Sequence, residues 1–201
     1  MKKPLRIISK LESKGLNLIK GISFDGHRVL GQAHLFAQKY YKENIDEILY
    51  LDTVASLYSR PVLDDNIKKA CQSFFIPSSC GGGIKSLKKI ESLLKSGADK
   101  VLINSFATKK PQFIKDASKV FGSQCISIGI DVFYRDKNFE VWTDYGRERT
   151  KLNLLNWVKK VQDLGAGEII LSSINNDGTG KGFNIRLIEK VVEKIKIPLV
   201  Y

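Results

Sequence analysis

Long apolar runs, cysteine and histidine are all scarce in this sequence. It contains no run of 18 apolar residues, so we expect no transmembrane helix, and its basic first ten residues lack an apolar stretch of signal-peptide length. The 201 residues include only three cysteines and two histidines. The cysteines are widely spaced, which favours reduced thiols in a cytoplasmic protein over a disulfide framework. His27 and His34 have no cysteine or carboxylate at ligand spacing, so we predict no metal site.

The net charge is the strongest bias in the composition. Lysine and arginine number 33 against 21 acidic residues, a formal charge of +12. The simplest interpretation is a set of lysine-rich, solvated helix faces, and the sharper one is an anionic, phosphorylated substrate. The basic residues are not interleaved with aromatics, and no zinc spacing or recognition helix is evident. Nucleic acid is therefore not an expected partner.

Short apolar runs alternate with amphipathic stretches along the whole chain. Leu87, Ile90, Leu93 and Leu94 form one helical stripe, which we expect to begin after Ser86 and stop at Gly97. Similar stripes run through 157–164 and 185–195. The expected strands are Leu5–Ile8, Glu47–Leu51, Phe75–Cys80, Lys100–Ile103, Ile126–Asp131, Glu168–Ser172 and Ile197–Tyr201. Strands and helices that alternate in this way predict parallel pairing in an α/β fold.

An internal repeat defines the fold further. Residues 45–51 (IDEILYL) resemble 166–172 (AGEIILS), and Ile76-Pro77 resembles Ile197-Pro198. Each pair is separated by about 120 residues, the length of four β/α units. Two such halves predict a (β/α)8 TIM barrel. We therefore expect one incomplete barrel domain over 1–201, with half-barrels at about 1–122 and 123–201, cut short after about six and a half β/α units.

Parallel barrels carry their active sites at the C-terminal ends of the strands, so the residues that end each strand are candidates. Glu12 is taken as the end of the first strand, beyond its apolar run Leu5–Ile8, and Asp131 ends the fifth strand. Opposed carboxylates of this kind suit general acid–base catalysis. The alternative is that each carboxylate only caps a loop or a helix.

Glycine-rich loops follow two of the strands. Gly81-Gly82-Gly83, with Asn104-Ser105 on the next strand, would let backbone amides approach an anion. Asp177-Gly178 opens a second candidate phosphate loop, and Lys20 is placed to reach the same end of the barrel. Plain turns and a solvated lysine are the alternative interpretations.

These segments together resemble one family. The segments are Arg6-Ile7-Ile8, Leu18-Ile19-Lys20-Gly21, Asp46-Glu47-Ile48, Leu51-Asp52, Gly81-Gly82-Gly83-Ile84, Gly97-Ala98-Asp99-Lys100-Val101, Ile103-Asn104-Ser105, Phe121-Gly122-Ser123-Gln124, Gly165-Ala166-Gly167-Glu168-Ile169 and Asp177-Gly178-Thr179. In this order they resemble the cyclase subunit of imidazole glycerol phosphate synthase, and the resemblance covers essentially the whole chain.

The resemblance implies a lyase that works with a separate glutaminase subunit as a heterodimer, without cofactor or metal. Ammonia from the glutaminase would pass through the barrel and attack a bisphosphorylated ribulosyl aminoimidazole-carboxamide ribotide. The products would be imidazole glycerol phosphate and an aminoimidazole-carboxamide ribotide. The residues implied are catalytic Glu12 and Asp131; phosphate- or substrate-binding Lys20, Gly83, Asn104, Ser105, Gln124, Asp177 and Gly178; and a charged ammonia gate of Arg6, Glu47, Lys100 and Glu168.

Three departures from the family pattern keep alternatives open. Glu12 stands where the family has Asp, and Gln32 and Asn175 also replace acidic residues. A carboxylate misplaced by about 1 Å can cost on the order of 100-fold in rate. One alternative is a non-cyclase paralogue that partners an amidotransferase in nucleotide-sugar amidation for surface polysaccharide. The other is an inactive fragment, poorly soluble by itself because its sheet edges are open.

Overall fold

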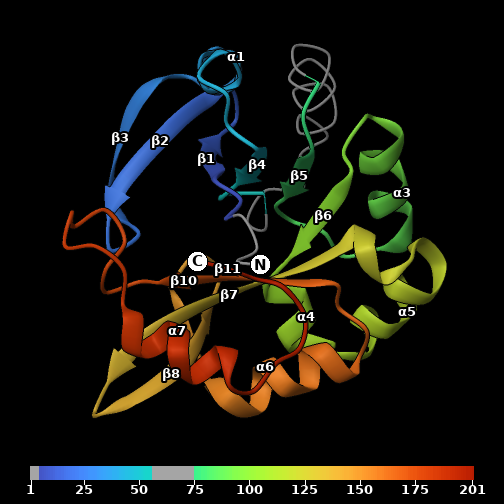
Figure 1. Ribbon diagram of the computed structural model, residues 1–201, viewed down its shortest axis with the longest axis vertical. Helices are drawn as coiled ribbons and strands as arrows, with labels where there is room; N and C mark the ends of the chain where they lie inside the picture. Colours follow the sequence, from blue (N-terminus) through green and yellow to red (C-terminus); the bar gives the residue numbers. More distant parts are fainter. Residues whose placement is uncertain (1–4, 56–74) are drawn as a thin grey trace. The chain divides into compact units, whose positions relative to one another are not determined.

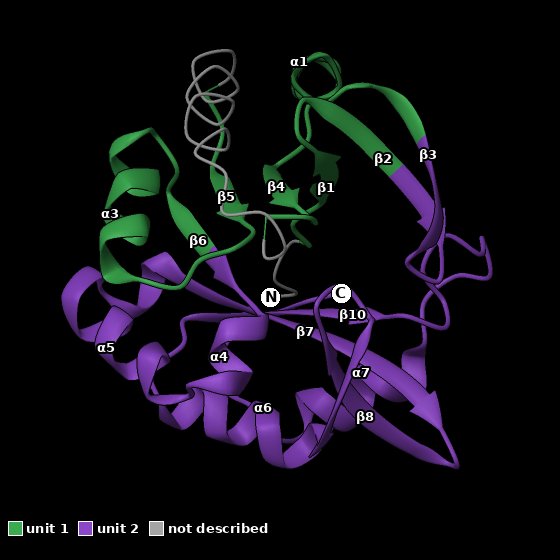
Figure 2. Cartoon of the chain, turned by 180° about the vertical axis from the view of Figure 1, so that it is seen from behind, with its two compact units in different colours: residues 1–19, 29–101 green, residues 20–28, 102–201 purple. Residues whose placement is uncertain are grey.

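The computed structural model describes residues 5–55 and 75–201, an α/β chain with helices in the connections between strands (Figure 1). Cys71 lies outside the described residues. Two compact units are distinguished, coloured separately in Figure 2. Unit 1 comprises residues 1–19 and 29–101, and unit 2 comprises 20–28 and 102–201. Within the described residues, no helix combines the length and apolarity needed to cross a bilayer.

Unit 1 is built on parallel strands with an antiparallel addition at one edge. Strand β1 pairs in parallel with β4, and β4 pairs in parallel with β5. After β1 the chain reverses through Gly15, and β2 returns antiparallel with Lys14 opposite Asn17. The bounds are β1 Ile8–Lys14, β2 Asn17–Ile22, β3 Asp25–Gln32, α1 Ala33–Lys42, β4 Glu47–Asp52, β5 Ser78–Gly81 and α3 Leu87–Lys95, with β2 and β3 shared between the units.

Unit 2 repeats the parallel plan and adds a hairpin. Strand β10 pairs in parallel with both β7 and β11, and β8 and β9 extend β7 as antiparallel strands. The bounds are β6 Lys100–Ile103, α4 Ser105–Lys109, α5 Gln112–Phe121, the 3-10 helix η1 Ser123–Cys125, β7 Ile126–Arg135, β8 Asn138–Thr143, β9 Glu148–Asn153, α6 Leu154–Asp163, β10 Glu168–Ser173, α7 Ile185–Val192 and β11 Leu199–Val200. The boundary between the units passes through β6.

Strand β7 shows how these strands place a site. Ile126, Ile128 and Ile130 are fully buried on one face, while Ser127 and Asp131 are buried on the other. Because side chains alternate along a strand, one sequence of ten residues supplies both an apolar core row and a polar row. The polar row ends in the candidate catalytic carboxylate.

Most predicted elements are confirmed, with shifted boundaries. The strands expected near residues 47, 100, 126 and 168 are all present. The first strand is predicted wrongly: it begins at Ile8, where the prediction Leu5–Ile8 ends, because its polar residues Lys10 and Glu12 hide it from an apolar pattern. Strand β5 likewise begins only at Ser78, and Phe75 is 91% exposed.

The helix that was expected to begin after Ser86 does so. The Ser86 hydroxyl oxygen accepts the backbone N–H of Lys89 at 3.2 Å, which satisfies one of the free donors of the first turn. Ile90 and Leu93 then form its buried face. Helix α7 is shorter than its apolar stripe, since it ends at Val192 rather than Ile195.

Candidate functional site

Glu12 lies near the C-terminal end of β1 and is 1% exposed. Its carboxylate oxygen Oε1 is 2.8 Å from the ammonium nitrogen of Lys10, two residues earlier on the same strand. A carboxylate this deeply buried is stable in its charged form only with a partner of opposite charge or good hydrogen bonds. The structure therefore joins Glu12 to a lysine that the sequence analysis did not single out.

Asp131 lies in the polar row of β7 and is 7% exposed. The side-chain amide of Asn104 donates a 2.7 Å hydrogen bond to its Oδ2. Asn104 directly follows β6 and precedes α4, so both residues belong to the C-terminal parts of neighbouring strands in unit 2. Two residues predicted for different roles, one catalytic and one phosphate-binding, thus contact each other.

Lys20 and Asp177 form an ion pair, with Nζ 2.7 Å from Oδ1. The backbone N–H of Ser23 also donates to the carbonyl of Asp177 at 2.8 Å. The loop after β10 is therefore fastened to the end of β2 by one side-chain and one backbone contact. Both predicted anion-binding residues lie at this junction within unit 2.

Gly178 is required at this junction for two reasons. Its φ is +71°, and a Cβ built on it would lie 2.2 Å from the carbonyl oxygen of Gly21. Gly180, two residues later, has nearly the same φ of +70°, and among the described residues no atom lies within 4 Å of its built Cβ. The two glycines therefore share a backbone conformation, but only at Gly178 would a Cβ meet a neighbouring atom.

We expect Gly178→Ala to destabilise the chain by about 3 kcal/mol, because a left-handed alanine and an enforced backbone shift each cost about 1–2 kcal/mol. Gly180→Ala, the matched control, loses only the conformational part, about 1 kcal/mol. Urea unfolding of both variants measures the difference. Equal losses would show that the close approach to Gly21 has no energetic weight.

The glycine triplet after β5 forms a tight turn that packs against the loop after β4. Gly83 has φ +63°, and a Cβ there would lie 2.7 Å from the carbonyl oxygen of Ala55. In unit 2, the hydroxyl of Ser105, another predicted phosphate-binding residue, accepts a 2.9 Å hydrogen bond from the backbone N–H of Asp144. Glycine is thus demanded at 83 by contact with the chain itself.

Gln124 does not join the other predicted ligands. It is exposed in η1, before the first residue of β7, whereas Asp131 is near the far end of the buried part of that strand. Seven residues of extended chain span roughly 23 Å. The structure therefore corrects the prediction that placed Gln124 in a phosphate site at the C-terminal ends of the strands.

Two of the four predicted gate residues contact the carboxylate of a third. Glu47, 1% exposed at the start of β4, lies 3.3 Å from Arg6 Nη1 and 3.1 Å from Lys100 Nζ. The hydroxyl of Ser79 donates to its Oε1 at 2.6 Å. Glu168, the fourth, starts β10 in unit 2 and accepts a 3.2 Å hydrogen bond from Ser127. Ser79 and Ser127 were missed by sequence reasoning, because lone serines in a strand carry no signal.

The opposite face of β1 and β4 holds a separate polar group. Burial raises the pKa of Tyr50, an effect that its hydrogen bond with Ser13 opposes and the nearby Asp52 reinforces. Asp52 accepts the backbone N–H of Val54 through Oδ1 at 3.0 Å. Asp52 therefore caps the turn after β4.

His27 lies on β3 and packs its ring against Tyr145, with 5.3 Å between ring centroids. Tyr145 in turn stacks on Phe24 at 4.4 Å. The histidine is half-buried in this aromatic group.

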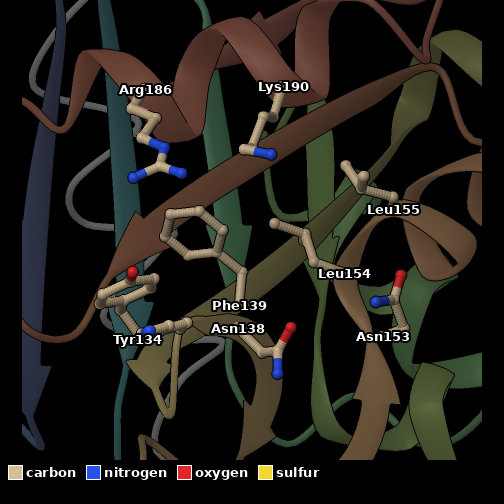
Figure 3. Close-up of a pocket in the computed structure, with 9 residues that line it drawn as sticks. Tyr134, Asn138, Phe139, Asn153, Leu154, Leu155, Arg186 and Lys190 are labelled. Atoms are coloured by element: carbon tan, nitrogen blue, oxygen red, sulfur yellow. The ribbon is translucent and has the colours of Figure 1, made fainter.

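A small, open pocket lies elsewhere in unit 2, with the side chains of Arg186 and Lys190 on one side and the rings of Tyr134 and Phe139 opposite (Figure 3). Leu154 at the start of α6 forms part of its floor. None of the predicted site residues lines it. It arises where the β7–β8 hairpin meets α6 and α7, a meeting that sequence patterns do not reveal.

The comparisons with known proteins agree with this geometry. The family model for "Histidine biosynthesis protein" matches residues 11–201. A Legionella pneumophila protein named imidazole glycerol phosphate synthase subunit HisF is 44% identical over 198 residues, covering 98% of this chain and 93% of its own length. Proteins of the same name are 41% identical in Thermococcus onnurineus and 38% identical in Methanocaldococcus jannaschii, each covering 97% of this chain and 77% or 79% of their own lengths.

The family model matches most of the chain, and the three relatives are 38–44% identical to it over nearly its whole length. The parallel strands, the connecting helices and the polar rows at the strand ends are those of a (β/α)-barrel of the TIM type. This chain therefore belongs to the histidine biosynthesis protein family.

Proposed function

We propose that this chain is the cyclase subunit of imidazole glycerol phosphate synthase. It uses ammonia to convert the bisphosphorylated ribulosyl aminoimidazole-carboxamide ribotide into imidazole glycerol phosphate and an aminoimidazole-carboxamide ribotide. The observation that carries the proposal is Asp131, a buried carboxylate at a strand end, oriented by the Asn104 amide. The shared name of relatives 36–44% identical over nearly the whole chain supports it.

In this proposal Glu12 and Asp131 move the protons of the ring closure. Both carboxylates are buried, so their proton affinity depends on fixed neighbours rather than on bulk water. Each already has one: the Lys10 ammonium for Glu12 and the Asn104 amide for Asp131. Lys20, Gly83, Asn104, Ser105, Asp177 and Gly178 are the proposed phosphate-binding residues.

The ammonia would come from a glutaminase subunit bound at the N-terminal ends of the strands. Glu47 and Lys100 each begin a strand and form, with Arg6, a charged cluster at that end of unit 1. Glu168 begins β10 in the same way in unit 2. We propose that these four residues make the ammonia gate, and that the heterodimer acts in the cytoplasm.

Conversion of the bisphosphorylated substrate with ammonium salt alone, without any glutaminase, tests the proposal directly. We expect both products to form, at a rate that rises with pH as more of the ammonium is deprotonated to the nucleophile ammonia. Product analysis by anion-exchange chromatography detects them. No product at saturating ammonium across the pH range would sink the assignment.

The paralogue that only channels ammonia in nucleotide-sugar amidation is not favoured by the relatives. One observation favours testing this alternative: Glu12 stands where the family has Asp. Adding glutamine and a histidine-pathway glutaminase separates the two possibilities, because only the cyclase consumes the ribotide.

A further inference from the structure

The Lys10–Glu12 pair has a defined place within unit 1. Side chains two residues apart on a strand share a face, so Lys10 and Glu12 lie on the same side of β1. The pairing of Lys10 with Leu49 and of Glu12 with Leu51 extends that face onto β4. Leu49 and Leu51 pair in turn with Ser79 and Gly81 of β5.

Toward the N-terminal ends of the strands, the same face reaches the charged cluster of Arg6, Glu47 and Lys100. Ile8 pairs with Glu47, two residues before the Lys10 level. Unit 1 thus presents three successive levels on one face of its strands: Glu47 at the N-terminal end, Lys10 in the middle, and Glu12 at the C-terminal end. On this face of unit 1, Lys10 stands between Glu47 and the proposed catalytic carboxylate of Glu12.

Lys10 is well placed to control the charge of Glu12. Its side chain is 23% exposed and Glu12 is 1% exposed, so water screens the pair weakly. The other charged groups on this face, Arg6, Glu47 and Lys100, belong to the cluster at the N-terminal level. Tyr50 and Asp52 alternate with Leu51 and therefore lie on the opposite face of β4.

Lys14 provides an internal comparison. It lies two residues after Glu12, as Lys10 lies two residues before it, but it is exposed at the end of β1 and pairs with Asn17. Among the described residues, no ion pair joins Lys14 to Glu12. Equal spacing along the strand therefore gives one lysine a contact with the carboxylate and leaves the other in solvent.

We propose that Lys10 is a positioning residue for Glu12, holding its carboxylate ionised and in one conformation for proton transfer. Glutamate has one more rotatable bond than aspartate, and the ion pair restrains that extra freedom. This inference rests on the proposed cyclase function and adds to it a residue that works through Glu12.

The test compares Lys10→Met, Lys10→Arg and the control Lys14→Met in two measurements. The first is the titration of the Glu12 side-chain carboxyl by ¹³C NMR, with the resonance assigned from its loss in Glu12→Gln. We expect Lys10→Met to move the titration midpoint upward by about one pH unit or more, because the ionised form loses its nearby cation. Lys10→Arg keeps the cation and Lys14→Met leaves the pair intact, so both are expected to titrate as the unaltered chain does.

The second measurement is the ammonium-dependent reaction over pH. We expect Lys10→Met to lower kcat by about 100-fold, with little change in KM, and to move the acidic limb of the profile in the same direction as the NMR titration. Lys10→Arg is expected to recover most of kcat. Should Lys10→Met fail to fold, Lys10→Gln retains a polar side chain at the same site and takes its place in both measurements.

The two measurements separate this inference from the proposed function. An unaltered chain that makes no product refutes the cyclase, while the Glu12 titration still tests the pairing. An unchanged titration in the Lys10→Met and Lys10→Gln variants overturns the inference, whatever the activity. A shifted titration with unchanged kcat and unchanged pH profile also overturns it, because Lys10 would then affect Glu12 without serving the reaction.

Discussion

Replacing Asp131 by Asn is expected to lower kcat/KM for the ammonium-dependent reaction by about 10²–10⁴-fold. The amide keeps the size and shape of the carboxylate but cannot accept and return a proton. Asn104 Nδ2, 2.7 Å from Oδ2 in the unaltered chain, would retain an oxygen acceptor if the new amide turns its oxygen toward it. The fold should therefore survive, and steady-state kinetics at saturating ammonium measure the loss.

Asp136→Asn serves as the matched control. Asp136 lies five residues further on, where the chain turns between β7 and β8, and its side chain is 81% exposed beside Arg135. The same chemical change there should leave kcat/KM unaltered. A loss in D131N no greater than in D136N would remove Asp131 from the mechanism.

Replacing Glu47 by Ala is expected to destabilise the fold strongly. Loss of the carboxylate leaves Lys100, only 17% exposed, without the oxygen 3.1 Å from its ammonium, and also frees the Ser79 hydroxyl. Breaking a buried pair in this way costs about 3–5 kcal/mol. We expect a value near 3 kcal/mol, since Arg6 is 42% exposed and water can replace part of its contact. Urea unfolding followed by circular dichroism gives the free energy.

Glu91→Ala is the comparison for that experiment. Glu91 also contacts a lysine, Lys95 at 2.6 Å, but both side chains are exposed on α3. Solvent and salt screen such pairs, so its removal should leave the free energy of unfolding unchanged within error. If the two variants lose equal stability, burial does not strengthen the Glu47 cluster.

The fold was largely readable from the sequence because buried parallel strands are short, apolar and regularly spaced. Strands β4, β6, β7 and β10 were each predicted within a few residues of their observed bounds. The first strand was misplaced for a physical reason: it carries Lys10, Glu12 and Ser13 in its middle, and these residues face partners that only the folded chain supplies. The β8–β9 hairpin was missed because β9 is mostly polar and exposed, so that it carries no apolar strand pattern.

The candidate site was only partly predictable. The strand-end rule located Glu12 and Asp131, and the family resemblance located the residues around Glu47. Neither source indicated that Asn104 would hold Asp131, since pairing between side chains on different strands depends on register. Lys10 could have been found from its two-residue spacing to Glu12, once that stretch was recognised as a strand. Gln124 was misassigned because matching its motif to the family does not show at which end of the neighbouring strand the residue lies.

The alternating rows of β7 have a consequence for how such a chain changes over generations. The isoleucines at 126, 128 and 130 are constrained by packing in the buried core, and Asp131, in the row of Ser127, is constrained by the proposed chemistry. Substitutions in one row leave the other nearly unchanged, so stability and reactivity can change independently within one strand. A single-residue insertion or deletion within it exchanges the two rows. Point substitution should therefore be tolerated at many positions of β7, and length variation at none of its buried ones.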